Sequence, residues 1–155
     1  MAKNSDDFSY FCPIMLGNIG FLSAKLANLI ADSFAEFTSK YELTPRHCGV
    51  LFIASSGKYS QKEIALMLNA DKNILVQIID YLESLNLLKR VKNPQNRKEN
   101  IIELSKKGKE LSKALQEKML SNQQNQLSFL PQKRYLELIS ILQEIHLHNI
   151  KKGEE

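Results

Sequence analysis

The order of helix signals after Leu43 constrains this 155-residue chain more than any other feature. Thr44 is followed by proline, and a Thr N-cap with Pro at the first helical position predicts the start of a helix. Ser60 with Glu63 three residues later has the spacing of a capping box and predicts a second, short helix. Asp71 is placed to cap a third helix, which runs to about residue 85 with apolar side chains at helical spacing.

A two-strand hairpin is predicted directly after these three helices. Residues 87–91 and 100–104 are short apolar runs of strand type, and the segment between them is polar and contains Pro94. Because proline cannot donate to a strand ladder, Pro94 is expected at the hairpin tip or at an edge. Ser105 then caps another long helix.

Three helices followed by a hairpin make a helix-turn-helix with a wing, a scaffold that places one helix in the DNA major groove. Charge is distributed accordingly. Residues 57–109 contain eleven Lys or Arg and six Asp or Glu, whereas the rest of the chain has a net charge of −1. The positive surplus therefore lies in the winged segment, as expected for a surface that faces phosphates.

The two ends of the chain are predicted to be helical and to form a dimerisation region. Apolar residues step by three and four from Ile14 to Tyr41, which predicts one long helix, and Pro131 begins a last helix. Such apolar helices need a partner along their length, so we expect a symmetric homodimer. The fold class is thus mainly α with a minor β component. The organisation is residues 1–43 for dimerisation, 44–109 for the winged helix-turn-helix, and 110–155 for dimerisation again.

Taken in order, several segments resemble the MarR (multiple antibiotic resistance regulator) family of winged-helix transcription factors. They are Gln61-Lys62-Glu63-Ile64-Ala65, Leu82-Glu83 with Leu85-Asn86-Leu87, and the wing from Pro94 to Gly108 that ends in Leu104-Ser105-Lys106-Lys107-Gly108. The family's wing usually carries Asp-Arg-Arg where this chain has Asn96-Arg97-Lys98, and its recognition helix often has Arg where this chain has Tyr81. The resemblance implies a DNA-binding regulator, by analogy a repressor, that is released by a small lipophilic or phenolic effector or by an oxidant.

The first two turns of the third helix are expected to face base edges. Asn73 and Gln77 lie four apart on one face, and both amides can bond an adenine edge. Arg97 at the hairpin tip is expected in the minor groove. Arg90 has a second interpretation, as a structural ion pair that braces the wing. The residues expected to contact a pseudopalindromic DNA operator are Ser60, Gln61, Lys62, Lys72, Asn73, Ile74, Val76, Gln77, Tyr81, Arg90, Arg97 and Lys98.

The resemblance also implies an effector site between the outer helices and the winged lobe, and the alternative for its candidate residues is plain core packing. The candidate residues are Phe21, Phe34, Phe37, Cys48 and Phe52. The resemblance also makes Cys12 a candidate redox sensor, because a branch of the family senses organic hydroperoxides through a cysteine near this place. An incidental thiol is the alternative for Cys12, and buried core is the alternative for Cys48.

Several function classes are not expected. The two cysteines and three histidines show no metal-ligand spacing, so we expect no metal and no cofactor. The chain lacks a phosphate-cradling glycine loop and a nucleophile–base arrangement, so we expect no enzyme. No apolar run approaches the ~18–20 residues that span a bilayer, and residues 1–10 do not have a signal-peptide pattern, so we expect a cytoplasmic protein without membrane contact. The alternative to a DNA-binding regulator is a winged-helix module that binds another protein.

Overall fold

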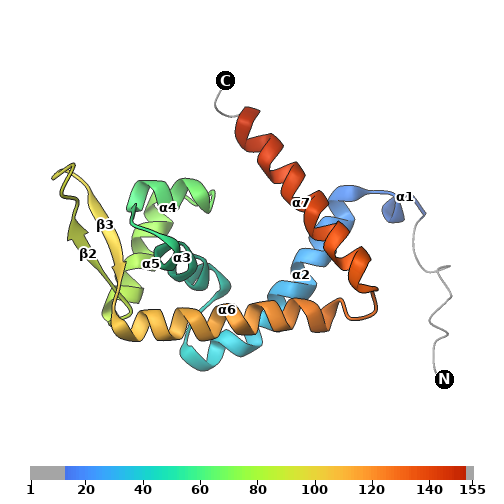
Figure 1. The fold of residues 1–155 in the computed structure, drawn as a ribbon, viewed down its shortest axis with the longest axis horizontal. Helices are drawn as coiled ribbons and strands as arrows, with labels where there is room; N and C mark the ends of the chain where they lie inside the picture. Colours follow the sequence, from blue (N-terminus) through green and yellow to red (C-terminus); the bar gives the residue numbers. More distant parts are fainter. Residues whose placement is uncertain (1–12, 153–155) are drawn as a thin grey trace.

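The computed structural model describes residues 13–152, which are mainly helical with one small antiparallel sheet (Figure 1). The elements in chain order are α1 (Pro13–Leu16), α2 (Ile19–Thr38), the 3-10 helix η2 (Ser39–Tyr41), α3 (Pro45–Ser56), β1 (Tyr59–Ser60), α4 (Gln61–Met67), α5 (Lys72–Ser84), β2 (Leu88–Lys92), β3 (Asn100–Leu104), α6 (Lys106–Gln126) and α7 (Gln132–Lys152). Elements α3 to β3 form one lobe, called the winged lobe below. The predicted fold class is confirmed.

Side-chain caps begin the helices of the winged lobe where the sequence predicts them. The Thr44 hydroxyl accepts the N–H of His47, the Ser60 hydroxyl accepts that of Glu63, and the Asp71 carboxylate accepts those of Asn73 and Ile74. Each cap satisfies backbone donors that have no partner within the helix. The chain therefore turns between helices at positions set by single polar residues.

The sheet contains one more strand than the sequence predicts. β3 lies in the centre and pairs antiparallel with β2 in the expected hairpin, where Leu88 faces Leu104. On its other side β3 pairs with β1, a two-residue strand in which Tyr59 faces Ile102. β1 leads directly into α4, so the sheet fixes the position of the helix-turn-helix relative to the wing.

The expected single helix from Ile14 to Tyr41 is wrong, because the chain breaks near its start. The Asn18 side chain accepts the N–H of Phe21 at 2.8 Å and begins α2 there, leaving α1 as a separate turn. The last residues form η2, and Glu42 follows in a left-handed conformation with φ of 58°. Apolar periodicity continues across both breaks and does not reveal them.

The core lies in the winged lobe, and α6 joins it from outside. Leu51, Leu75 and Leu115 are fully buried, and they come from α3, α5 and α6 respectively. The buried hydroxyl of Ser112 donates to the Leu51 carbonyl at 3.3 Å, so α6 and α3 are joined by a polar contact as well as by apolar packing. α6 extends from the winged lobe to the outer helices and connects the two parts of the molecule (Figure 1).

The outer helices expose apolar side chains. α7 lies at the end of the molecule that holds α1 and α2 (Figure 1), and Leu136, Ile145 and Leu147 on it are each more than half exposed. Ile14 and Ile19, near the break between α1 and α2, are each 78% exposed. Within residues 13–152, no helix combines the length and apolar content needed to cross a membrane.

Candidate nucleic-acid interface and effector cavity

The start of α5 presents a polar face to solvent. Lys72, Asn73 and Gln77 are exposed, whereas Leu75 and Ile79 on the opposite side are fully buried. Asn73 and Gln77 lie one helical turn apart, so their amides face the same direction. The amphipathic pattern thus fixes which side of α5 packs on the core and which side is available to a ligand.

A hollow of about 470 Å³ joins this helix to α4 and to the wing. Its walls carry three lysines, Lys62 from α4, Lys72 from α5 and Lys98 from the wing, against a single carboxylate, Glu99. Ser60 and Gln61 line it as well. Ser60 is only 5% exposed and its hydroxyl oxygen accepts the Glu63 N–H, so its first role is to cap α4. Three cations around one concave surface favour an anionic ligand such as phosphate.

The wing tip is a closed turn held by its own backbone and by two asparagines. The Asn93 N–H donates to the Glu99 carbonyl at 3.0 Å, and the Glu99 N–H donates to the Asn96 carbonyl at 2.9 Å. The Asn96 side chain accepts the N–H of Lys98 at 3.2 Å. The Asn96 side chain therefore orders the tip by accepting a hydrogen bond from a backbone N–H, and an aspartate side chain at this position could accept the same bond. Arg97 is exposed, and none of the ion pairs or hydrogen bonds among the described residues involves its side chain.

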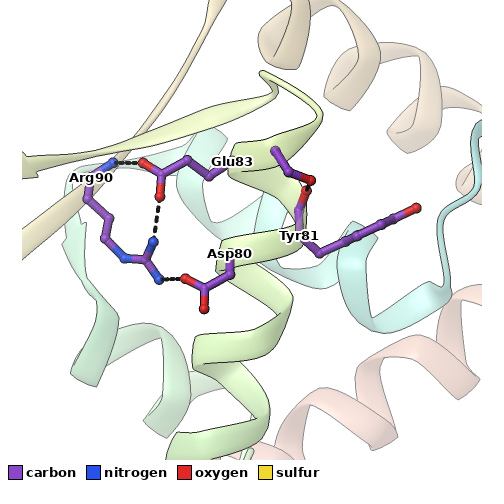
Figure 2. A network of polar contacts seen from close by, with 5 residues as sticks. Asp80, Tyr81, Glu83 and Arg90 are labelled. Carbon is purple, nitrogen blue, oxygen red and sulfur yellow. Dashed lines mark hydrogen bonds and ion pairs between the residues drawn. The ribbon is translucent and has the colours of Figure 1, made fainter.

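Arg90 has the surroundings of a structural ion pair. Figure 2 shows its guanidinium between the carboxylates of Glu83 and Asp80, both on α5, while its backbone N–H donates to Glu83 at 3.0 Å. Its side chain is 21% exposed. Arg90 on β2 thus ties the wing to the end of α5, which agrees with the second of the two interpretations that the sequence allows.

Tyr81 also turns toward the protein. Its hydroxyl donates to the carbonyl of Glu42 at 2.9 Å, and its ring lies 4.9 Å from the ring of His47 at an angle of 30°. The contact connects α5 with the junction between η2 and α3. Sequence reasoning missed this contact, because residues 39 apart give no local signal of it.

His47 caps α3 together with Thr44. Its Nδ1 accepts the backbone N–H of Thr44 at 3.0 Å, which requires a deprotonated Nδ1. Burial lowers the pKa of His47, because desolvation disfavours the charged ring. Glu63 fills the corresponding position in α4, where the hydrogen bond from the Ser60 N–H, at 2.7 Å, lowers the pKa of its carboxyl.

A second hollow, called the effector cavity below, has a volume of about 540 Å³ and lies between α2, α3, α6 and α7. Phe34 and Phe52 line it, as two of the predicted effector residues. Phe21, Phe37 and Cys48 do not belong to its wall. Phe37 instead packs edge-to-face on Tyr41 at 5.7 Å.

Cys48 is fully buried in the core, and burial raises the pKa of its thiol to about 11. The thiolate, which is the reactive form, is therefore disfavoured at neutral pH. Cys12, the candidate redox residue, lies outside the described residues. Among residues 13–152, no group of three or more His, Cys, Asp or Glu side chains is arranged to hold a metal ion.

Comparison with known proteins gives a clear result for the fold. No protein-family model and no curated protein matches this sequence. Solved structures do match. A MarR-family transcriptional regulator from Rhodococcus sp. RHA1 has a TM-score of 0.78 at 20% identity, with 84% of this chain and 93% of that chain covered.

Two further matches are structures of one regulator in two complexes. CouR from Rhodococcus jostii RHA1 bound to p-coumaroyl-CoA has a TM-score of 0.77 at 20% identity and covers 86% of this chain and 95% of its own. The transcriptional repressor CouR bound to a 23-mer DNA duplex has a TM-score of 0.78 at 22% identity, with 86% and 96% covered. Across nearly its whole described length, this chain has the winged helix-turn-helix fold of MarR-family transcriptional regulators.

Proposed function

We propose that this protein is a MarR-family transcriptional regulator that binds double-stranded DNA as a homodimer. The fold supports this proposal, and so does a similar protein whose structure contains a DNA duplex. The single observation that carries it is the convergence of three elements on one surface. Lys72 at the start of α5, Lys62 on α4 and Lys98, which follows Arg97 in the wing, line one hollow, called the lysine-lined hollow below.

On this surface, α5 would enter the major groove with its first two turns. The Asn73 and Gln77 amides can each bond an adenine edge with two hydrogen bonds, and Ile74, which is 42% exposed, can contact a thymine methyl group. Such contacts discriminate between bases, so they would supply the sequence specificity. Val76 is only partly exposed and would contribute at the edge of this face.

Phosphates would be bound around the lysine-lined hollow. Lys62, Lys72 and Lys98 can neutralise phosphate oxygens there, with Gln61 as a neutral donor. The wing would place Arg97 over the neighbouring minor groove, where A·T-rich sequence is narrow and strongly negative. Arg90 and Tyr81 would act indirectly, because their polar groups are bonded to α5 and to Glu42.

We propose that residues 1–43 and 110–155 form the dimerisation region. Its described part exposes apolar side chains on α1, α2 and α7, and a second copy would cover them. A two-fold dimer places two copies of α5 side by side and reads a pseudopalindrome with half-sites roughly one helical turn apart. The protein would act in the cytoplasm and, like the regulators that it resembles, would not be an enzyme.

The proposed regulatory action is repression that is relieved when a small lipophilic or phenolic effector occupies the effector cavity. Its wall includes Phe52 from the winged lobe and Leu138 from α7. A ligand that contacts both would favour some relative positions of the winged lobe and α7 over others. It would thereby change the spacing between the two copies of α5 in the dimer. One similar regulator is known in a complex with p-coumaroyl-CoA.

Selection of bound sequences from a random pool of double-stranded DNA tests this function. We expect enrichment of a pseudopalindrome whose half-site centres are about 10 base pairs apart. Absence of any enriched sequence, with the protein folded and dimeric, would contradict the proposal. That result would favour a winged-helix module that binds another protein.

A further inference from the structure

The chemistry of the effector cavity narrows the class of molecule that it can hold. Its wall is formed mostly by aliphatic and aromatic side chains from four helices, among them Leu26, Ile30, Phe34, Met119 and Leu138. Its volume of about 540 Å³ falls within the range of pockets that bind small molecules. A wall of this composition binds ligands mainly by burying apolar surface.

No charged side chain belongs to this wall among the described residues. Two other hollows differ in this respect. The lysine-lined hollow contains Lys62, Lys72 and Lys98, and a third hollow of about 420 Å³ at the start of α3 and α5 contains Arg46 and Asp71. The lack of charge is therefore a property of the effector cavity and not of the protein's hollows in general.

Three polar side chains do line the effector cavity, and all of them are neutral. They are Ser23 on α2, Gln123 on α6 and Tyr135 on α7. None of the hydrogen bonds within residues 13–152 involves these side chains, so each is available to a ligand. Hydroxyl and amide groups can donate to or accept from a ligand hydroxyl or carbonyl, but they cannot neutralise a full charge.

We propose that the effector cavity selects a small uncharged lipophilic ligand and excludes carboxylates and other anions. A carboxylate that enters loses its hydration and gains no cation in return, whereas a neutral molecule of the same shape loses little. This inference rests on the proposed function only for its regulatory consequence, because ligand binding itself can be measured without DNA.

Calorimetric titration of the full-length protein with 2-naphthol and with 2-naphthoate tests the proposal. The two probes share one ring system, and at pH 7.5 the first is neutral and the second is an anion. We expect 2-naphthol to bind at least tenfold more tightly. Equal or tighter binding of 2-naphthoate, or no binding of either probe, would overturn the proposal.

Variants that introduce a cation into the wall of the effector cavity test whether this wall determines the preference for the neutral probe. Gln123→Arg on α6, and independently Ser23→Arg on α2, should reduce the preference for 2-naphthol at least fivefold by improving the binding of 2-naphthoate. Gln124→Arg is the matched control, because Gln124 is exposed, follows Gln123 on α6 and does not belong to the cavity wall, and it should leave the preference unchanged. Loss of the preference in the control, or no effect of either arginine variant, would place the bound probe elsewhere and overturn the assignment. Because no DNA is present, these results are independent of whether an operator can be selected.

Discussion

Two arginines of the same hairpin have opposite surroundings, and the difference decides what each can do. Arg90 is held between Glu83 and Asp80, so its charge is largely compensated within the protein. Arg97, seven residues later, is exposed at the tip of an ordered turn. Residue type alone therefore does not identify a DNA contact, since the nearby carboxylates determine which cation is available to phosphate.

The first prediction concerns Arg97. Arg97→Ala should weaken DNA binding at least several-fold and lower the slope of log affinity against log salt by about one, because one fewer phosphate-associated counterion is released. Fluorescence anisotropy of a labelled operator at several salt concentrations measures both quantities. Lys113→Ala, which removes an exposed cation on α6, should change neither. An Arg97→Ala variant with unchanged affinity would show that the wing does not reach the DNA.

The second prediction concerns the pH dependence of stability at His47. Burial lowers the pKa of this group in the folded state, so the unfolded chain takes up the proton first as the pH falls. The contribution of His47 to the free energy of unfolding is therefore complete above its pKa in the unfolded chain, which is about 6.5. That contribution is lost as the pH falls toward the lower pKa of the folded state. Urea unfolding of the wild type should show a midpoint that decreases between pH 7 and pH 5.

His47→Gln is the matched variant for this measurement. Glutamine at this position can still accept the Thr44 N–H in a capping box, but it does not titrate. The midpoint of His47→Gln should therefore decrease less than that of the wild type over the same interval. Parallel pH profiles for the two proteins would disprove the role of the histidine.

At the scale of elements, the start of α6 packs tightly against the turn before β2. Gly108 lies in the first turn of α6, and a Cβ built there would lie 1.8 Å from the carbonyl oxygen of Leu87. The same carbonyl accepts the N–H of Ser105 at 3.0 Å, so it cannot move without breaking that bond. The glycine allows α6 to begin directly against the wing.

The third prediction follows from this contact. Gly108→Ala should lower the free energy of unfolding by about 1–3 kcal/mol or more, because the backbone of Leu87 must shift. Chemical denaturation measures the change. Gly17→Ala is the control, since the nearest atom to a Cβ there lies 3.8 Å away, and its stability should stay within about 1 kcal/mol of the wild type. Equal effects of the two substitutions would contradict the steric explanation.

The elements that the sequence predicts well are those that begin at a side-chain cap. Thr44, Ser60 and Asp71 each act on donors two or three residues away, so the sequence contains the whole interaction. The break at Asn18 escaped prediction because apolar spacing continues through it, although Gly17-Asn18 has the residue types of a helix boundary. β1 escaped because two residues are too few to show an alternating pattern.

At the scale of the whole molecule, the sequence indicates which helices expose apolar surface but not how they enclose space. The effector cavity takes its wall from helices separated by up to about a hundred residues, and only two of the five predicted effector residues, Phe34 and Phe52, belong to it. Phe37 has the same residue type and helical spacing, yet it faces Tyr41. Such a distinction depends on tertiary packing, which local patterns do not contain.

The fourth prediction concerns assembly. Replacing Ile141 and Ile145, which are 54% and 53% exposed on α7, by glutamate should convert a dimer into a monomer at micromolar concentration, because charge is then introduced into the shared apolar surface. Analytical ultracentrifugation measures the mass. Leu66→Glu changes a side chain that is 82% exposed on α4, outside that surface, and should sediment as the wild type does. A wild-type monomer at the same concentration would refute the assembly.

The most direct test of sequence-specific DNA binding is a comparison of two labelled duplexes by fluorescence anisotropy at physiological salt. One carries the pseudopalindrome selected from the random pool, and the other has the same base composition in scrambled order. The wild type should bind the first at least about 10³-fold more tightly, and Asn73→Ala with Gln77→Ala should remove most of that ratio. Equal affinities of the wild type for the two duplexes would contradict the account, because the surface of α5 and the wing would then not read sequence.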